Sequence, residues 1–254
     1  MTGPVVSLIA LDDLPLVEAG DDLAAMLIAA VRRKNIAPVD HDILVVAQKI
    51  VSKAEGRMVR LADVKPSPRA AAIADEIGKD SRLVELVLSE GTEIVRRAPN
   101  LLIVEHRSGF VMANAGIDQS NVGGDGEHAL LLPRDADASA AALKAALDRE
   151  FGVDLGVLIN DSFGRPWRKG VVGVAIGAAG VPSLVSLVGK PDLMGRKLRV
   201  TEVAFADELA AAASLIMGQG DEGRPAVYIR GVGYDGPPMP ACAIARPKET
   251  DLFR

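Results

Sequence analysis

The most informative segment of the chain is Leu158-Ile159-Asn160-Asp161-Ser162-Phe163-Gly164-Arg165-Pro166-Trp167-Arg168-Lys169-Gly170. The apolar run at residues 155–159 predicts a short buried strand. The Asn-Asp-Ser and Gly-Arg-Pro triplets after it predict that the strand ends there in a turn. An acid and a hydroxyl directly after a buried strand, here Asp161 and Ser162, can hold a hard cation through oxygen ligands.

Positive charge follows the same turn, in Arg165, Arg168 and Lys169, beside the only tryptophan of the chain, Trp167. Cations next to a metal site suit a polyanion such as a nucleotide phosphate, because the metal and the guanidinium groups share its charge. The alternative interpretation is a strand, a turn and a solvated basic loop, since short motifs often arise by chance.

The composition is that of an ordinary globular protein. The 254 residues can bury a sizeable core, as one large domain or two modest ones, and 49% are apolar and 25% charged. A net charge of −5 and an aromatic content of 3% argue against a nucleic-acid binder, which needs basic and stacking surfaces. The single cysteine, Cys242, excludes an internal disulfide, and three scattered histidines give no structural zinc pattern.

Targeting and membrane signals are missing from the sequence. The start, Met1-Thr2-Gly3-Pro4, has no basic region followed by an apolar core, and no apolar run approaches the ~18 residues of a membrane span. We therefore expect a cytoplasmic protein without a membrane partner. Internal repeats and low-complexity linkers are also missing, so we expect residues 1–254 to form a single unit, in which a boundary between two lobes is not readable from the sequence.

Further strands and helices are predicted on both sides of the opening segment. Apolar runs predict strands at residues 5–11, 43–47, 101–105, 110–113, 171–177 and 226–230, of which 101–105 and 110–113 form a hairpin. Helices are predicted at residues 22–33, 68–77, 82–90, about 137–151 and 206–217. Helix caps are predicted at Asp21 or Asp22, at Ser67 and at Asp137 or Ser139, with stops at Gly78 and Gly152.

Polar residues also follow the strand predicted at 43–47. Gln48, Lys49, Ser52 and Lys53 come directly after it, and the lysines could meet phosphate oxygens as point charges. The segment by itself favours the other interpretation, a charged surface turn. Asp40-His41-Asp42, just before the same strand, is expected to be solvated and not to bind a metal, because short acid and histidine clusters usually lie in turns.

A third polar segment, residues 114–124, follows the hairpin and contains Asp118, Asn121, Gly123 and Gly124. Asp118 is the natural metal partner of Asp161, because a divalent ion bound to phosphates needs only one or two carboxylates. An Asx-turn is the rival interpretation of Asp118 and Asn121.

Neither of two common nucleotide motifs is supported. No Gly-x-x-x-x-Gly-Lys-Ser/Thr occurs, which excludes a P-loop. The segment Gly231-Val232-Gly233-Tyr234-Asp235-Gly236 matches Gly-x-Gly-x-x-Gly, but Pro237-Pro238-Met239-Pro240 prevents the helix that a dinucleotide site requires. We therefore expect a turn there.

With these segments in hand, the sequence closely resembles the coenzyme F420:L-glutamate ligase family. The matching pieces are Leu14-Pro15-Leu16-Val17, residues 50–57, 113–121 and 161–170, and residues 206–210 through Gly218-Gln219. They cover nearly the whole chain in order, and five weak motifs in the right order are specific. The resemblance implies a mixed α/β fold that is not a P-loop fold, with mixed sheets and flanking helices, in an intertwined homodimer.

The resemblance further implies a GTP-dependent ligase that adds L-glutamate to the terminal carboxylate of coenzyme F420-0, with two sites for Mg²⁺ or Mn²⁺, and it leaves K⁺ open as a helper ion. Asp118 and Asp161 would hold one metal, with Ser162 and Gln219 near the second. We expect Lys53 and Arg165 to act in catalysis beside the two acids. The residues implied for the GTP site are Leu14, Pro15, Leu16, Val17, Gln48, Lys53, Asn121, Met217, Gly218, Gln219, Gly220, Asp221, Glu222, Gly223 and Arg224.

The implied chemistry is phosphoryl transfer followed by displacement. The γ-phosphoryl group of GTP would convert the coenzyme's carboxylate to an acyl phosphate, and the glutamate amine would then displace phosphate. Two alternatives remain: a deazaflavin- or flavin-dependent oxidoreductase, and a non-enzymatic module that binds metal and nucleotide. The number of glutamates added and the coenzyme tail accepted are left open.

Overall fold

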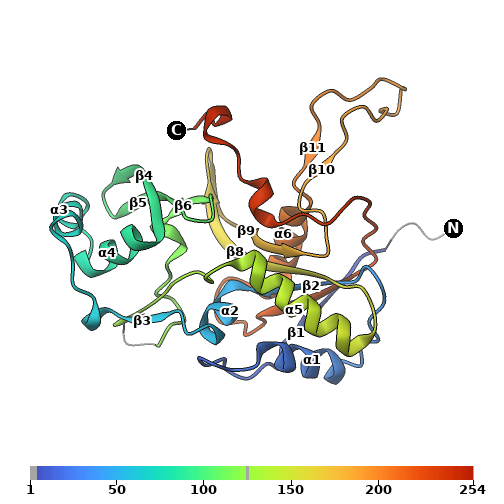
Figure 1. The fold of residues 1–254 in the computed structure, drawn as a ribbon, viewed down its shortest axis with the longest axis horizontal. Helices are drawn as coiled ribbons and strands as arrows, with labels where there is room; N and C mark the ends of the chain where they lie inside the picture. Colours follow the sequence, from blue (N-terminus) through green and yellow to red (C-terminus); the bar gives the residue numbers. More distant parts are fainter. Residues whose placement is uncertain (1–4, 124–125, 254) are drawn as a thin grey trace.

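The computed structural model describes residues 5–123 and 126–253; residues 1–4 and Gly124, named above, lie outside this part. Its central sheet has five strands, in the spatial order β1 (Ser7–Leu11), β12 (Ala226–Arg230), β2 (Ile43–Ala47), β8 (Gly156–Arg165) and β9 (Arg168–Ala179) (Figure 1). β2 and β8 are parallel, while the other neighbours are antiparallel. The fold is mixed α/β, as predicted.

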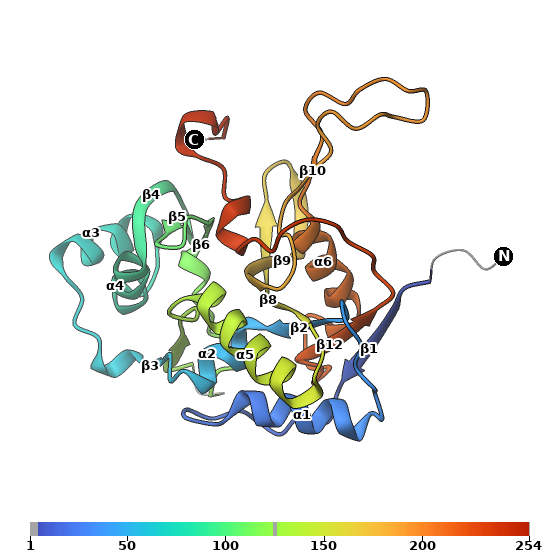
Figure 2. The same ribbon diagram turned by 45° about the vertical axis from the view of Figure 1, so that its right-hand side comes forward.

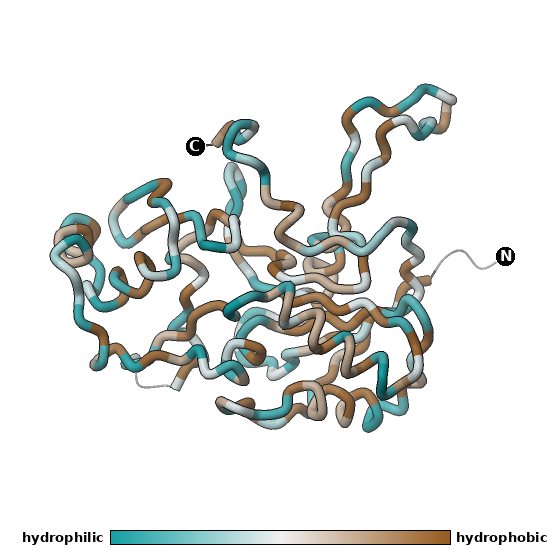
Figure 3. Tube along the Cα trace, in the orientation of Figure 1, coloured by the Kyte–Doolittle hydropathy of each residue, from teal (hydrophilic) through white to brown (hydrophobic). Residues whose placement is uncertain are grey.

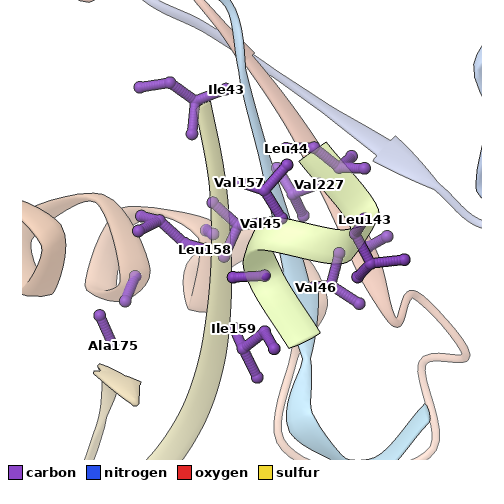
Figure 4. Packing of buried hydrophobic residues seen from close by; sticks show 14 of the residues in the cluster. Ile43, Leu44, Val45, Val46, Leu143, Val157, Leu158, Ile159, Ala175 and Val227 are labelled. Atoms are coloured by element: carbon purple, nitrogen blue, oxygen red, sulfur yellow. The ribbon is translucent and has the colours of Figure 1, made fainter. Parts of the chain in front are cut away.

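Helices cover both faces of this sheet, which explains why β2 and the first half of β8 are continuous apolar runs. Helix α5 (Ala136–Phe151) packs on one face and α6 (Phe205–Met217) on the other, while α1 (Leu23–Arg33) packs against α5 (Figures 1 and 2). Figure 4 shows Leu143 of α5 on one side of β8, near Val157 and Ile159, while Leu158 points to the opposite side.

Local caps begin and end the helices mostly where the sequence predicts. Asp22 accepts the N–H of Ala25 at the start of α1, and Ser67 accepts that of Ala70 at the start of α3 (Pro68–Ile77). Gly78 and Gly152 end α3 and α5 in the left-handed conformation, with φ of 72° and 70°.

The predicted cap of α5 is wrong. Asp135 is the capping residue and accepts the N–H of Ala138, rather than Asp137 or Ser139. The Asp137 carboxylate is used elsewhere, because it accepts backbone N–H groups of Ala178 and Ala241, while the Ser139 hydroxyl donates to Glu55.

A second, smaller hydrophobic cluster lies beside the first. It is built from α3, α4 (Ser81–Glu90) and a three-stranded sheet of β4 (Gly91–Ala98), β5 (Leu101–His106) and β6 (Val111–Ala113). The short strands β3 (Met58–Arg60) and β7 (His128–Leu130) pair next to it, with the 3₁₀ turns η1 (Leu61–Asp63) and η2 (Asn114–Gly116). The predicted β5–β6 hairpin is confirmed, whereas β4 was missed.

Two predicted turns are wrong. The strand predicted at 155–159 does not end at Asn160: β8 continues to Arg165, because β9 pairs with it and supplies hydrogen-bond partners, as in the Asp161–Val174 and Ser162–Gly173 pairs. The polar run after β2 is not a surface turn but the helix α2 (Gln48–Ala54).

The sequence predicts a solvated Asp42, and this prediction is wrong, because the side chain is buried. Its carboxylate is 2% exposed and accepts hydrogen bonds from the Tyr228 hydroxyl at 2.6 Å and from Arg230 Nη2 at 2.6 Å. Both partners lie on β12, so the acid fixes the end of β2 against the neighbouring strand.

Residues 187–201 form an arm beyond the short strands β10 (Val185–Ser186) and β11 (Glu202–Val203), and it stands clear of the body (Figures 1 and 2). Figure 3 shows hydrophobic and polar residues alternating along it; Leu193 and Met194 are almost fully exposed. The last described elements are the 3₁₀ turns η3 (Ala241–Ile244) and η4 (Lys248–Thr250), and residues 231–236, where we expected a turn, form irregular backbone without a helix. Among the described residues, no helix has the length and apolar character needed to cross a bilayer.

Candidate functional site

Three segments that are distant in sequence meet where β2 ends. β2 pairs with β8 as far as Ala47 and Asn160, so Asp161 is the first residue of β8 beyond that pairing. α2 begins at the same point and carries Lys49. Asp118 comes from the segment after η2, where its backbone exchanges two hydrogen bonds with Leu130, at 3.0 and 2.8 Å.

Lys49 is the cation at this junction. Its Nζ lies 2.6 Å from Asp118 Oδ2 and donates to the carbonyl and hydroxyl oxygens of Ser120. Ser120 in turn donates its N–H and its hydroxyl to Asp118 Oδ1, at 2.7 and 2.8 Å. The Asx-turn interpretation of Asp118 is therefore confirmed locally, and the turn presents the acid to Lys49.

The two carboxylates have opposite pKa shifts. Burial raises the pKa of Asp161 to about 6, and the charge of Asp118 contributes to the rise, against the N–H of Ser162 and the charge of Lys49. Burial acts in the same direction on Asp118, but the bonds from Lys49 and Ser120 outweigh it and lower its pKa. The Lys49 ammonium thus pairs with Asp118 and acts on Asp161 only through its charge, so the negative charge of Asp161 is compensated less.

A chain of hydrogen bonds joins this junction to the loop at 217–224. Lys53 Nζ donates to the carbonyl of Asn121 at 3.1 Å, and the Asn121 amide donates to the carbonyl of Gly220 at 3.2 Å. Glu222 accepts the N–H of Gly220 at 2.8 Å and so holds the loop in shape. Lys53, Asn121 and the loop from Met217 to Arg224 therefore form one connected rim.

Side-chain alternation along β8 separates the predicted metal ligands into two groups. The Asn160 amide donates to Ser214 on α6, so Asn160 and Ser162 face α6, while Asp161 faces the opposite side with Asp118. Gln219 follows the C-terminal end of α6, the side that Ser162 faces. The assignment of Asp118 with Asp161, and of Ser162 with Gln219, stays a prediction.

Three other predicted site residues either lie far from Asp161 or are buried in the protein. Arg165 is exposed at the hairpin end, four residues beyond Asp161, which is about 13 Å along a strand. Gln48 is 2% exposed and accepts the Ser52 hydroxyl, so its side chain points into the protein. Met217 is also buried.

The segment Leu14, Pro15, Leu16 and Val17 connects β1 to α1. Leu16 is 91% exposed and Val17 is buried, and the N–H of Gly20 just beyond donates to the carbonyl of Ala54 at the end of α2. The loop that contains this segment therefore reaches the C-terminal end of the helix that carries Lys49 and Lys53.

Lys49 is a residue of this site that the sequence did not predict as a site residue, although it lies in the polar run after β2. Lys49 and Lys53 are spaced i, i+4, which places both on one face of a helix. That spacing would have selected Lys49 had the run been recognised as helical rather than as a turn.

The residues at the junction fit a hard divalent cation. Their donors are carboxylate oxygens, and two carboxylates suffice for Mg²⁺ or Mn²⁺ when phosphates and water complete the coordination. Within the described residues no group of three or more His, Cys, Asp or Glu side chains gathers. Asp161, raised in pKa beside Asp118, is a carboxylate that a cation would stabilise.

Comparison with known proteins gives one consistent result. Residues 13–231 match the family model described as F420-0:Gamma-glutamyl ligase. The chain is 49% identical to the coenzyme F420:L-glutamate ligase of Methanothermobacter thermautotrophicus over 254 residues, 98% of this chain and 99% of that protein. It is 46% identical to the protein of the same name from Methanopyrus kandleri (94% and 93% covered) and 43% to that from Archaeoglobus fulgidus (98% and 96%).

Proposed function

Because the chain belongs to the F420-0:gamma-glutamyl ligase family and is a ligase, we propose that it joins the amine of L-glutamate to the terminal carboxylate of coenzyme F420-0, using GTP. Family membership replaces the oxidoreductase and the non-enzymatic module as interpretations. Cytoplasmic location stays a prediction.

One observation carries the proposal of phosphoryl transfer: Asp118 and Asp161 lie close enough for their charges to interact, with Lys49 paired to Asp118, beside the rim formed by Lys53 and the 217–224 loop. Acids and lysines gathered at a strand end are the groups needed to hold a metal–nucleotide phosphate. Asp118 and Asp161 would hold Mg²⁺ or Mn²⁺, which would supply charge neutralisation for the transferred phosphoryl group.

Residues of the chain itself would bind the phosphate groups of GTP. Lys49 and Lys53 would bind phosphate oxygens as point charges, because each now donates to a backbone carbonyl or a carboxylate that a phosphate can replace. A carboxylate oxygen of the coenzyme attacks the γ-phosphorus and GDP leaves. The glutamate amine then attacks the acyl carbon, phosphate leaves with the former carboxylate oxygen, and the amine releases a proton.

The homodimer is part of the same proposal. The arm at 187–201 exposes Leu193 and Met194 away from the body, and exposed apolar side chains on a protruding segment are typical of surfaces that another chain covers. A second copy of this chain is the partner that the resemblance implies.

The test is the product. F420-0, GTP, L-glutamate and Mn²⁺ should give a product heavier by one or more glutamyl residues, with GDP and phosphate, and excess EDTA should stop all three. Full product formation in EDTA would contradict the metal assignment, and product formation with ATP but not with GTP would contradict the nucleotide assignment.

A further inference from the structure

We propose that the cavity between the N-terminal end of α5, the β5–β6 turn and η3 binds the amino-acid substrate, with Arg134 and Arg107 holding its two carboxylates. The inference rests on the proposed function, because it takes L-glutamate to be the amine donor. The chemical class of the ligand is an L-α-amino acid with a second carboxylate.

The cavity has a volume of about 490 Å³, within the range of pockets that hold small ligands. Its walls come from four parts of the chain: the β5–β6 turn, residues 132–137, Ile176 of β9, and the segment of Pro240 and Cys242. Leu132, Pro133, Ile176 and Pro240 supply an apolar wall that suits the methylene groups of a glutamate side chain.

Two arginines, Arg107 and Arg134, line the cavity. Arg107 pairs with the buried Glu90, which also pairs with Arg57 at 2.7 Å, so one carboxylate is shared by two guanidiniums and the cluster keeps a positive charge. Arg134 makes no ion pair with any residue that the structure describes, although its backbone N–H is fixed by Glu55. An arginine held at a pocket without a carboxylate partner is suited to bidentate binding of one from a ligand.

Two acids, Asp135 and Asp137, also line the cavity and decide whether it can hold the ammonium group of an amino acid. Asp137 is fully used by backbone N–H groups of Ala178, Ala241 and Cys242, so it adds little attraction for a cation. Asp135 uses only Oδ1, to cap α5, and its other oxygen can accept the ammonium group of an amino acid. Two guanidiniums and one free carboxylate oxygen complement two carboxylates and one ammonium group, whereas a simple phosphate would use the arginines alone.

The cavity lies next to the junction of Asp118 and Asp161, on the same side of the sheet. Asp161 faces α5, and Ile176 lies on β9 two residues beyond Val174, the partner of Asp161, which is about 7 Å along the strand. On the other side, Leu132 lies two residues beyond Leu130, the backbone partner of Asp118. An amine bound here would approach an acyl phosphate formed at the two acids.

Arg134→Gln tests the assignment by kinetics. It should raise the KM for L-glutamate about 10- to 100-fold, the loss expected for a charge-assisted hydrogen bond, and leave the KM for GTP unchanged. Arg134→Lys should recover part of the loss, since it keeps the charge without the fork. Arg149→Gln, an exposed arginine at the far end of the same helix, is the matched control and should behave as wild type.

Different results would contradict the proposed function and the cavity assignment. If the wild-type protein ligates no glutamate, the proposed function is wrong. If it does, and the KM for L-glutamate is the same in Arg134→Gln as in wild type, the proposed function stands and the cavity assignment is overturned.

Cys242 gives a second readout, independent of turnover, because it lines the cavity and is the only cysteine. Labelling by N-ethylmaleimide is followed at alkaline pH, since partial burial and Asp137 raise the pKa of the thiol. L-glutamate should slow labelling of the wild type and of Arg149→Gln but not of Arg134→Gln, and L-alanine should slow none of them. Equal labelling rates with and without saturating L-glutamate, or protection by inorganic phosphate that glutamate does not exceed, would overturn the proposal.

Discussion

Replacing Asp161 with asparagine should stabilise the metal-free protein while removing its activity. The side chain keeps its shape and can still accept the N–H of Ser162, but it loses the charge that faces Asp118. An acid whose pKa is raised on folding makes the folded state less stable once it ionises, so the substitution should relieve that penalty.

The size of the effect follows from the pKa of Asp161, which rises from 3.8 to about 6. Each pKa unit corresponds to about 1.4 kcal/mol, so the penalty is at most on the order of 3 kcal/mol in the metal-free protein. The folded pKa is the higher one, so the penalty is absent below about pH 4, grows as the pH rises toward 6 and is complete above it. The variant should therefore gain stability at pH 8 and none at pH 3.5.

The assay is urea unfolding in EDTA at both pH values, beside glutamate ligation in Mn²⁺. Turnover should fall about a hundredfold or more, because even partners of metal ligands can cost that much when removed. Asp207→Asn is the matched control: Asp207 also has a pKa raised by burial and also accepts a backbone N–H, from Ala175, but it lies on α6. It should keep its activity. An Asp161→Asn protein that is less stable in EDTA at pH 8, yet still ligates glutamate, would refute the reasoning.

Three further predictions test other parts of the molecule. Lys53→Ala should weaken GTP binding by about 1.5–3 kcal/mol, measured by titration calorimetry, and unchanged binding would return Lys53 to a structural link with Asn121. Burial would raise the pKa of Glu90, but His106, Arg57 and Arg107 lower it to about 2. The stability that Glu90 adds should therefore be lost as the pH falls from about 4.5 to 2. Glu90→Gln should make the free energy of unfolding depend less on pH in this range, and an unchanged pH dependence would contradict this. Replacing both Leu193 and Met194 with serine should shift the protein from dimer to monomer in light scattering without lowering its melting temperature, and an unchanged mass would exclude the arm as the dimer contact.

Much of the fold was readable from local signals. The strands at 43–47 and 226–230 are short apolar runs that are buried on both faces, and such runs are recognisable without knowledge of their neighbours. The caps Ser67 and Gly78 depend on bonds within one turn of the helix, so the sequence places them correctly. The acids Asp118 and Asp161 were selected because each follows an apolar run, and they do lie close enough for their charges to interact.

Tertiary structure alone decided where these signals fail. β8 continues through Asp161 because β9 returns beside it and pairs its backbone, and nothing in the local sequence states that a partner strand will be present. Asp135 rather than Asp137 caps α5 because a β9 residue and the C-terminal segment claim the Asp137 carboxylate. The polar character of residues 48–54 and of Asp42 predicted solvent exposure, but α2 packs its apolar side and β12 brings Tyr228 and Arg230 to Asp42.

The candidate site shows the same division. The sequence determined which residues have suitable chemistry, because carboxylates, lysines and glycines are properties of the chain itself. It did not determine that Lys49 neutralises Asp118, that Asn121 joins Gly220, or that Arg134 borders a cavity without a carboxylate partner among the described residues. Each of these contacts joins residues from separate elements, and their distance is set by the packing of the whole sheet and its helices rather than by spacing along the chain.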